Sequence, residues 1–335
     1  MKQRLDEFEI IKKYFLPLTN QSKQAAGLND DAAFIDISPN KELVISKDLI
    51  VEDIHFYLRD GGYNIASKLL RANLSDLAAS GAKPLYYMLG FSKNKNLQEK
   101  FIADFCLGLK DSAAAYKLFL IGGDSVSTAD KLFFSLTIFG EIKKGRRLSR
   151  NQAIDGDLIF ISGNIGDAFL GLAISQEKIT NATNSAKKYL LKRLYQPTPR
   201  IELGINLLTK KLANAAIDIS DGLFADLRHI CCASKLDAII YQNQIPLSKT
   251  AKSILKTNSN FNIADLASSG DDYELIFTAD KKNKDKIIAL GKKIGIKITA
   301  IGEMKKRSDK TDSEVILLDK KNQKIDIHKY GYLHF

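Results

Sequence analysis

The sequence predicts an α/β (α+β) protein of two domains, an N-terminal mixed αβ domain followed by a C-terminal αβ domain. Three observations indicate this class. The chain has 335 residues, which exceeds the usual length of one domain. Apolar runs of strand length alternate with amphipathic segments at helical spacing. Aspartate-containing turns close many of the apolar runs, and at residues 216–223 a buried strand is expected to lead directly into a helix.

The first half of the chain is expected to begin with an amphipathic helix at residues 5–18, where apolar side chains recur at helical spacing. The apolar residues at 30–35 then predict a strand that enters the core. A short strand is expected at 43–46, and it ends in a turn at Asp48.

The clearest helix of this half is predicted at residues 65–79, because Gly81 and Pro84 supply stop signals beyond it. Asp76 lies in its last turns, where a carboxylate is unfavourable with the helix dipole. An acid placed against local preference indicates a role outside the helix. The other elements expected here are a helix at 97–116, a strand at 117–121 that stops at Gly122-Gly123-Asp124, and a long strand at 132–142.

The basic run at residues 143–147 is the best candidate linker. The domains are therefore expected at residues 1–148 and 149–335. Strands alternate with helical segments in the second half, as is typical of an αβ domain. The expected strands lie at 157–162, 215–219, 237–241, 273–279, 296–304 and 314–319. The glycine-containing segment 163–166 precedes a helix, and it is either a tight strand-to-helix turn or a loop that binds phosphate.

Composition argues against several classes of protein. No stretch approaches about 18 consecutive apolar residues, and the N-terminus lacks the apolar segment of a signal peptide, so a cytoplasmic protein with no membrane partner is expected. Three cysteines are too few for a disulfide framework. The net charge of +11 raises nucleic acid as a partner. However, the lysines alternate with acidic and apolar residues, as on solvated helix faces, so no nucleic-acid partner is expected.

The aspartate-containing turns recur from residue 30 to residue 272, each at the edge of an apolar segment. Any one of them has a structural interpretation, because Asp and Asn bond local backbone amides in turns and at helix N-termini. Asp221, for example, would cap a helix that begins at Gly222. Together, however, the carboxylates indicate a site that gathers magnesium ions around a nucleoside triphosphate, since magnesium takes oxygen ligands from carboxylates, water and phosphate.

In their order along the chain, these turns resemble those of the thiamine-monophosphate kinase family, which has the aminoimidazole ribonucleotide synthetase-like fold. The resemblance begins near residue 28 and covers most of the chain. It rests on the motifs Asn29-Asp30-Asp31-Ala32-Ala33, Ser46-Lys47-Asp48, Val51-Glu52-Asp53-Ile54-His55-Phe56, Asn73-Leu74-Ser75-Asp76-Leu77, Gly122-Gly123-Asp124-Ser125, Asp218-Ile219-Ser220-Asp221-Gly222-Leu223 and Gly270-Asp271-Asp272-Tyr273-Glu274-Leu275. It implies phosphorylation of thiamine monophosphate to thiamine diphosphate by ATP, through direct in-line transfer with several Mg²⁺ ions. It also implies a homodimer whose N-terminal sheets pair across the two copies.

The resemblance also implies roles for individual residues. Metal ligands would be Asp30, Ser46, Lys47, Asp48, Asp76, Asp124, Asp218 and Asp221. ATP would contact Gly123, Asp124, Arg150 and Ser220. The thiamine substrate would contact His55, Asp271 and Tyr332. The residues on which catalysis would depend most are Asp48, Asp124 and Asp221.

Four positions depart from the family pattern. Asn29 and Asp53 stand where glycine is usual, Lys47 where threonine is usual, and Asp271 where glutamate is usual. If the threonine binds metal through its backbone carbonyl, lysine replaces it without loss. If it binds through its hydroxyl, one ligand is lost. The side chain of Asp271 is one methylene shorter than glutamate, which weakens the case for its substrate contact.

Two alternative functions remain open on the sequence. The nearer one is another ATP-using enzyme of the same fold group, such as an aminoimidazole ribonucleotide synthetase-like enzyme, although those share the acidic turns less completely. The other is a basic protein that binds nucleic acid. The kinase interpretation accounts for a signature rich in Asp and poor in His, because a phosphate acceptor is already ionised at neutral pH and needs no strong general base.

Overall fold

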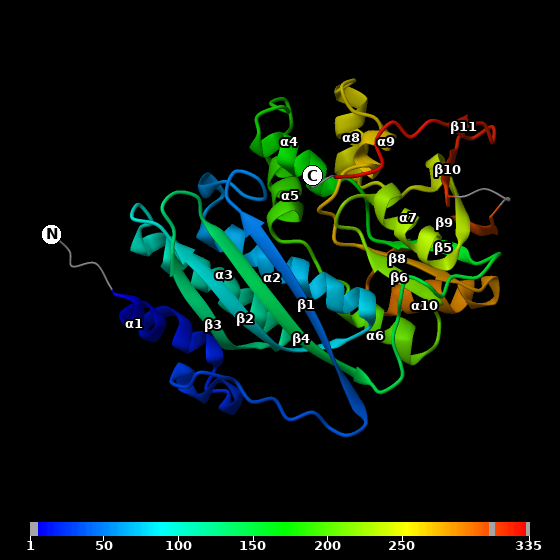
Figure 1. The fold of residues 1–335 in the computed structure, drawn as a ribbon. Coiled ribbons are helices and arrows are strands. Elements are labelled where there is room, and N and C mark those ends of the chain that lie inside the picture. Colours follow the sequence, from blue (N-terminus) through cyan, green and yellow to red (C-terminus); the bar gives the residue numbers. More distant parts are fainter. Residues whose placement is uncertain (1–5, 308–311, 333–335) are drawn as a thin grey trace. The chain divides into compact units, whose positions relative to one another are not determined.

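The computed structural model describes residues 6–307 and 312–332, and the chain forms two compact units (Figure 1). Unit 1 extends to Leu77 and includes Lys83–Gly145, while unit 2 consists of Ala78–Ala82 and the chain from Arg146 onward. The basic run at 143–147 lies where the chain passes from unit 1 to unit 2. In the part of the chain that the structure describes, no helix is long and apolar enough to cross a membrane.

Unit 1 is built on a four-stranded sheet with strand order β1-β4-β2-β3, in which only the β2–β3 pair is parallel. Its strands are β1 (Lys41–Val51), β2 (Lys83–Lys93), β3 (Phe119–Ser127) and β4 (Phe133–Lys143). Helices α2 (Gly62–Ser80) and α3 (Glu99–Tyr116) lie along one face of the sheet (Figure 1). The helices predicted at 65–79 and 97–116 are therefore confirmed. Aromatic rings fill the layer between the sheet and these helices. The ring centroid of Phe134 in β4 lies 4.7 Å from that of Phe105 in α3.

Three strands of unit 1 differ from the prediction. β2 follows Gly81 and includes Pro84, both of which indicate a helix stop, and the sequence predicts no strand there. β1 and β3 each continue through a segment that is predicted to turn, so Asp48 lies within β1 and Asp124 within β3. In both cases the ladder to the neighbouring strand is unbroken at the aspartate. Cross-strand pairing therefore outweighs the local turn preference.

The N-terminal segments are also corrected. The strand predicted at 30–35 is absent, because residues 29–38 form neither helix nor strand and Phe34 is 70% exposed. The predicted first helix is present as three helical segments, α1 (Glu7–Ile10), η1 (Ile11–Phe15) and η2 (Leu16–Thr19). Two 3₁₀ segments follow in unit 1, η3 (Lys23–Leu28) and η4 (Leu58–Asp60).

Unit 2 contains a seven-stranded sheet with the order β11-β10-β7-β9-β5-β8-β6, in which β10–β7 is the parallel pair. Its strands are β5 (Leu158–Ser162), β6 (Ala215–Asp218), β7 (Leu236–Tyr241), β8 (Leu275–Ala279), β9 (Ile298–Lys306), β10 (Val315–Leu318) and β11 (Lys324–Ile325). The six predicted strands are confirmed with small changes at their ends, and only the two-residue β11 is additional.

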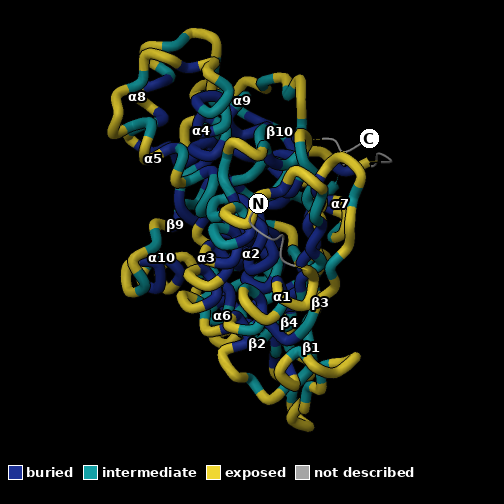
Figure 2. Tube along the Cα trace, turned by 90° about the vertical axis from the view of Figure 1, so that its left-hand side faces the viewer, coloured by how far each residue is buried: buried dark blue, intermediate teal, exposed yellow. Residues whose placement is uncertain are grey.

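Helices cover this sheet, and all residues of β6 and β8 are buried. The helices are α4 (Asp167–Ser175), α5 (Asn184–Tyr195), α6 (Ile201–Thr209), α7 (Leu223–Ser234), α8 (Lys249–Thr257), α9 (Ile263–Ala267) and α10 (Lys284–Lys293), with 3₁₀ turns η5 (Gln242–Gln244) and η6 (Lys281–Asn283). Figure 2 shows exposed residues on the outer turns of α8 and α10, as on other outer segments, and buried residues in the interior. Strands buried in this way account for the continuous apolar runs in the sequence.

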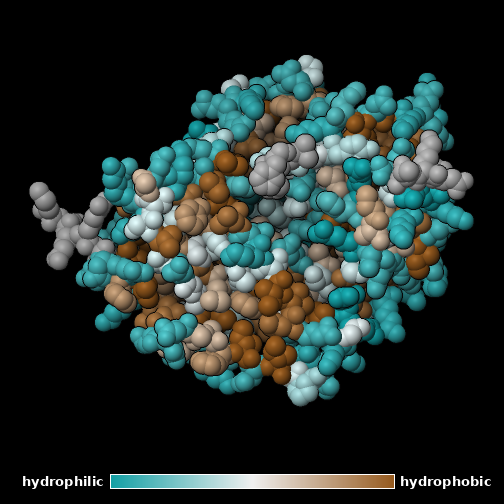
Figure 3. All heavy atoms as spheres, in the orientation of Figure 1, coloured by the Kyte–Doolittle hydropathy of each residue, from teal (hydrophilic) through white to brown (hydrophobic). Residues whose placement is uncertain are grey.

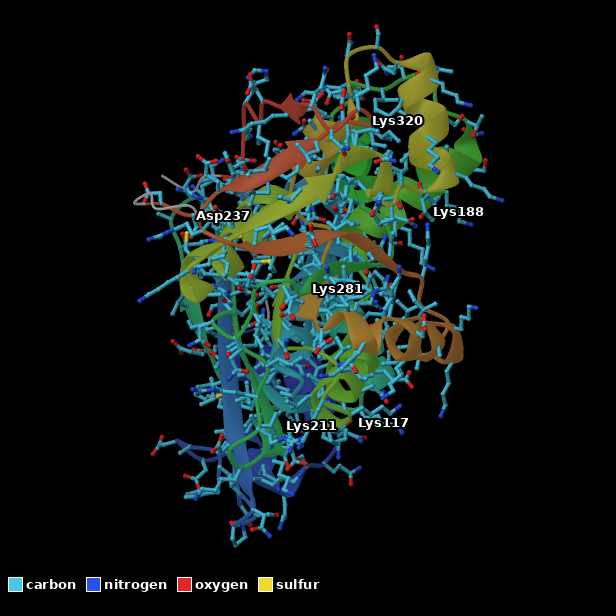
Figure 4. All side chains as sticks on the ribbon, turned by 90° about the vertical axis from the view of Figure 1, so that its right-hand side faces the viewer. Lys117, Lys188, Lys211, Asp237, Lys281 and Lys320 are labelled. Atoms are coloured by element: carbon cyan, nitrogen blue, oxygen red, sulfur yellow. The ribbon has the colours of Figure 1, made fainter. Side chains whose placement is uncertain are left out.

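The positive charge of unit 2 is dispersed. The labelled lysines Lys188, Lys211, Lys281 and Lys320 lie far apart and belong to different parts of the unit (Figure 4). All four are exposed. This distribution is that of solvated surfaces rather than of one basic patch.

Candidate active site

In unit 1, Ser46 and Asp48 lie on the face of β1 that is turned toward α2. The hydroxyl of Ser46 donates a hydrogen bond of 2.6 Å to the carboxylate of Asp76. Burial, and next the negative charge of Asp76, raise the pKa of Asp48 to about 7. Two carboxylates and a hydroxyl therefore form a set of oxygen donors. This donor set fits a magnesium ion, and a bound cation would favour the ionised form of both acids.

The donor set in unit 1 is small. Among residues 6–307 and 312–332, no three His, Cys, Asp or Glu side chains come together as a candidate metal site. Magnesium usually keeps only one or two carboxylates and completes its shell with water and phosphate oxygens. The two carboxylates of Asp48 and Asp76 are therefore enough protein ligands for one magnesium ion.

The opposite face of the same sheet holds Lys47 and Asp124. Successive side chains of a strand alternate between faces, so Lys47 points away from Ser46 and Asp48. Its Nζ donates to the hydroxyl of Ser135 at 2.5 Å. Asp124 of β3 pairs with Gly90 of β2, which in turn pairs with Ser135, so Asp124 lies on the same face as Lys47. Within unit 1 the structure therefore does not bring Asp124 together with Asp48.

The other predicted residues of unit 1 lie outside the Asp48–Asp76 pair. Asp30 is exposed in the irregular segment after η3. His55 follows β1, and its Nδ1 accepts a hydrogen bond of 3.2 Å from the Val51 N–H. Gly123 of β3 passes so close to β2 that an added Cβ would lie 2.1 Å from the Leu89 carbonyl oxygen. Only glycine fits at residue 123 without a shift of the backbone.

Two of the four departures from the family pattern have a backbone explanation. Asp53 has φ of 66°, a left-handed conformation that favours glycine and that Asp tolerates better than most residues. Its carboxylate forms an ion pair with Lys131. Asn29 has φ of −108°, so no glycine is required at that position.

In unit 2, the segment after β6 is joined to the segment before β8. The strands pair up to Asp218 opposite Leu275. Beyond that point the backbones continue to bond: the Tyr273 N–H donates to the Ile219 carbonyl and the Asp271 N–H to the Ser220 carbonyl, both at 2.8 Å. This pairing holds the predicted ATP contact Ser220 beside the predicted substrate contact Asp271.

Two residues near the C-terminus complete this group. The Tyr332 N–H donates to the Asp221 carbonyl at 2.9 Å, and the Ala225 N–H donates to the Tyr330 carbonyl at 3.1 Å. Tyr332 is 41% exposed, so its ring does not seal the core. The structure thus brings five predicted residues of unit 2 together, namely Asp218, Ser220, Asp221, Asp271 and Tyr332.

The backbone of Arg150 lies at the ends of β6 and α7 that are remote from this group. The preceding residue, Ser149, forms a bridge with Ala215 at the start of β6, and the Arg150 carbonyl accepts a hydrogen bond of 2.9 Å from Ser234 at the end of α7. Burial, and next the charge of Arg150, lower the pKa of His229, while the charge of Asp221 acts in the opposite direction. His229 on α7 therefore lies near both Arg150 and Asp221. The sequence offers no signal for this histidine.

The capping function expected of Asp221 is wrong. The N-cap residue of α7 is Gly222, and no side chain bonds it in the manner of a cap. Instead, Asp226 from within the helix binds the backbone of the turn. Burial, and next the charge of Asp221, raise the pKa of Asp226 to about 7.

The segment 163–166 is a tight strand-to-helix turn. The N–H groups of Gly163 and Ile165 bond the carbonyls of Lys297 and Pro246, at 2.8 and 2.9 Å. The Gly166 N–H donates to both oxygens of the buried Asp272. Because these three N–H groups are already bonded within the protein, they do not cradle a phosphate.

A buried ion cluster supports the same region. Glu274, whose side chain is 1% exposed, pairs with Arg193 at 3.0 Å and with Arg200 at 2.5 Å. Its carboxylate also accepts a hydrogen bond of 2.6 Å from Ser162. Glu274 therefore fixes the segment that leads to Asp271. The sequence marks Glu274 only as part of a motif and gives no sign of its burial.

The fold and these sites define the class of the protein. Residues 29–142 match the model of AIR synthase related protein, N-terminal domain, and residues 155–312 match that of its C-terminal domain. The structure of a hydrogenase maturation protein HypE in complex with ATP has the same fold, with a TM-score of 0.80 over 99% of this chain and 97% of that one, at 18% identity. The chain thus has the AIR synthase-related fold.

Closer relatives give the family. The thiamine-monophosphate kinase of Buchnera aphidicola subsp. Schizaphis graminum is 41% identical, covering 98% of this chain and 99% of that protein. That of Escherichia coli K12 is 35% identical over 98% of each chain. The thiamine-monophosphate kinase structure from Stenotrophomonas maltophilia K279a has a TM-score of 0.81 and 33% identity over 93% of this chain and 96% of that one. The chain belongs to the thiamine-monophosphate kinase family and is a kinase.

Proposed function

We propose that this protein transfers the γ-phosphoryl group of ATP to thiamine monophosphate and thereby forms thiamine diphosphate. The observation that supports this most directly is the full-length identity of 41% to a thiamine-monophosphate kinase. The structure of AaThiL complexed with AMPPCP and TMP covers 100% of both chains with a TM-score of 0.77 and 26% identity. That complex holds an ATP analogue together with the phosphate acceptor.

The residues of unit 2 suit the two substrates. Arg150 supplies a positive charge for the polyphosphate, and Ser220 supplies a hydroxyl beside it. Asp271 and Tyr332 are held next to Ser220 and Asp221 by backbone bonds of 2.8 and 2.9 Å. An acidic side chain and an aromatic ring suit the cationic thiazolium ring of thiamine. This geometry supports a donor and an acceptor bound side by side, as in-line transfer requires.

We further propose that the acidic residues hold magnesium. Asp48 and Asp76, with Ser46, would hold one ion, and Asp218 at the end of β6 and Asp221 just beyond it would contribute ligands to another. Bound magnesium would neutralise charge on the transferred phosphoryl group. The side chains of this protein would orient the two polyanions and exclude water between them. No side chain needs to accept a proton from thiamine monophosphate, because its phosphate is ionised at neutral pH.

The proposed homodimer is supported by an apolar face in unit 1. Ile45 is 56% and Leu49 53% exposed, and alternation along β1 places both on the face away from α2. Val126 and Phe133 are also exposed. Figure 3 shows hydrophobic surface where Figure 1 places β1 and β4. A sheet face of this kind is typically covered by another surface.

Incubation of the purified protein with ATP, Mg²⁺ and thiamine monophosphate tests the proposal. We expect stoichiometric formation of ADP and thiamine diphosphate, measured by chromatography. Replacing thiamine monophosphate by thiamine, which offers a hydroxyl in place of a phosphate, is the matched control and should give no product. Folded protein that binds Mg²⁺ and ATP yet forms no thiamine diphosphate would contradict the proposal and favour another ATP-using enzyme of this fold.

Replacement of Lys47 tests how residue 47 takes part in metal binding. Its side chain lies on the face of β1 away from Asp48, so any contact with that metal site is made by the backbone. We therefore expect Lys47→Thr and Lys47→Ala to have the same half-saturating Mg²⁺ concentration as the wild type. If only Lys47→Thr had a lower half-saturating Mg²⁺ concentration, the wild type would lack a hydroxyl ligand that threonine supplies.

Asp48 is expected to give the magnesium-free protein a pH dependence. Because its pKa is raised to about 7, the folded state binds more protons than the unfolded chain from about pH 4 to about pH 7, and stability falls as the pH rises through that window. We expect Tm to fall less over this range in Asp48→Asn than in the wild type. Magnesium binds the ionised form, so it should raise Tm more at about pH 8 than at about pH 6. Equal magnesium shifts at both pH values would contradict this assignment.

A further inference from the structure

Asp226, in the first turn of α7, binds the backbone of the segment that joins β6 to α7. Its side chain is 2% exposed. One oxygen, Oδ2, accepts hydrogen bonds from the N–H groups of Ser220, Asp221 and Gly222 at 3.1, 3.0 and 3.1 Å. Three successive N–H groups that converge on one point form a concavity that binds anions in other proteins. Here the chain's own carboxylate fills it.

The carbonyl groups of the same turn are held from the other side. The Ser220 carbonyl accepts from the Asp271 N–H at 2.8 Å, and the Asp221 carbonyl accepts from the Tyr332 N–H at 2.9 Å. Gly270 lies so close that an added Cβ would be 2.0 Å from the Ser220 carbonyl oxygen. The backbone at Ser220 and Asp221 is therefore fixed at both its donors and its acceptors.

This degree of constraint exceeds what a connection between a strand and a helix needs. Gly222 has φ of 134°, a conformation open mainly to glycine, so the turn has an unusual shape that the surrounding bonds must maintain. The side chains that the turn presents are Ser220 and Asp221, both half-buried. Any movement of this backbone would displace both side chains together.

We propose that Asp226 is a positioning residue for phosphoryl transfer, which holds the Ser220–Asp221 backbone so that both side chains face the bound nucleotide and its metal. The inference rests on the proposed function of those two residues. Residues that hold a metal ligand in place typically change metal affinity or activity by roughly 10–100-fold when they are replaced. The carboxylate of Asp226 holds the backbone of the proposed metal ligand Asp221 and does not bind the side chain of that ligand.

The test compares Asp226→Ala and Asp226→Asn with replacements of a second buried aspartate. Asp157 is 3% exposed and likewise binds a backbone N–H, that of Ile154 at 3.0 Å, and also the side chains of Asn214 and Thr278. It lies before β5 and contacts none of the proposed site residues. Asp157→Ala and Asp157→Asn are therefore matched controls for the loss of a buried acceptor.

Two quantities are measured for each variant: Tm alone, and the Mg²⁺ concentration that gives half of the Tm increase in the presence of AMPPCP. We expect Asp226→Ala to raise that concentration roughly 10–100-fold and to lower kcat to a similar extent. Asp226→Asn keeps an acceptor oxygen and should show a smaller shift, on the order of threefold. Both Asp157 variants should lower Tm and leave the magnesium midpoint unchanged.

Other outcomes decide against the inference. If Asp226→Ala lowers Tm but keeps the wild-type magnesium midpoint and kcat, Asp226 serves stability alone and the inference is overturned. If Asp226→Ala does not fold, equal magnesium midpoints for Asp226→Asn and Asp157→Asn overturn it. A wild-type protein that is not stabilised by Mg²⁺ and AMPPCP and forms no thiamine diphosphate overturns the proposed function, and the inference with it.

Discussion

Asp221→Asn is expected to lower kcat by roughly 10²–10³-fold while the fold survives, because removal of one preorganised charge from a phosphoryl-transfer site has effects of this size. The fold should survive because two backbone bonds of Asp221 hold it in this turn. Its N–H donates to Asp226 at 3.0 Å, and its carbonyl accepts from Tyr332 at 2.9 Å. Asparagine keeps both bonds and the shape of the side chain, and removes only the negative charge.

The measurement is kcat at saturating ATP and thiamine monophosphate over a range of Mg²⁺ concentrations, together with Tm. Asp285→Asn, at an exposed position in the first turn of α10, is the matched control and should match the wild type. Asp48→Asn and Asp124→Asn are expected to lower kcat strongly as well. Near-normal turnover in all three variants would show that the metal assignment is wrong even if the substrate is right.

Glu274→Gln is expected to destabilise the protein by about 3–5 kcal/mol, which is the usual cost of removing one partner from a buried ion pair. Glu274 is 1% exposed, while Arg193 and Arg200 are each 14% exposed. Neutralising the carboxylate leaves two guanidinium groups with little water and without their shared counter-ion. We expect Tm to fall by on the order of 10 °C.

The control for this prediction is Glu303→Gln. Glu303 also pairs with two cations, Lys281 at 3.2 Å and Lys305 at 2.7 Å, but both lysines are well exposed. Solvent screens such pairs, so its Tm should change little. If the two variants had the same Tm, the burial of the Glu274 cluster would not be the source of its contribution to stability. Thermal unfolding followed by circular dichroism measures both.

The helices α2 and α3 and the strands of unit 2 could be predicted because their signal is local. The helix at 65–79 has apolar residues at a period of 3.6, and α2 indeed covers that range. The buried strands β6 and β8 appear as continuous apolar runs closed by turn residues. These patterns depend on one segment only, so they can be recognised without knowledge of its neighbours.

Features that depend on two distant segments could not be predicted. Asp48 and Asp124 look like turn residues, and only the partner strands show that β1 and β3 continue through them. The burial of Glu274 is equally invisible, because Arg193, Arg200 and Ser162 are far from it in the sequence. Asp226 binds nearby residues, but its burial depends on the shape of the turn at 220–222, which the sequence does not show. A motif match identifies the aspartates that bear chemistry, but it does not distinguish Asp221, which is half-buried, from Asp226, which is fully buried.

The alternation of β1 has a consequence for which mutations this protein can tolerate. Ser46 and Asp48 point to one face of the sheet, while Lys47 and Leu49 point to the other. A point substitution changes one of these faces, but deletion of Lys47 would move Asp48, Leu49 and the residues beyond them to the opposite faces. Leu49 would then meet Asp76, and the acid would meet the apolar face. We expect sequence drift in this strand to proceed by replacement and never by insertion or loss of one residue.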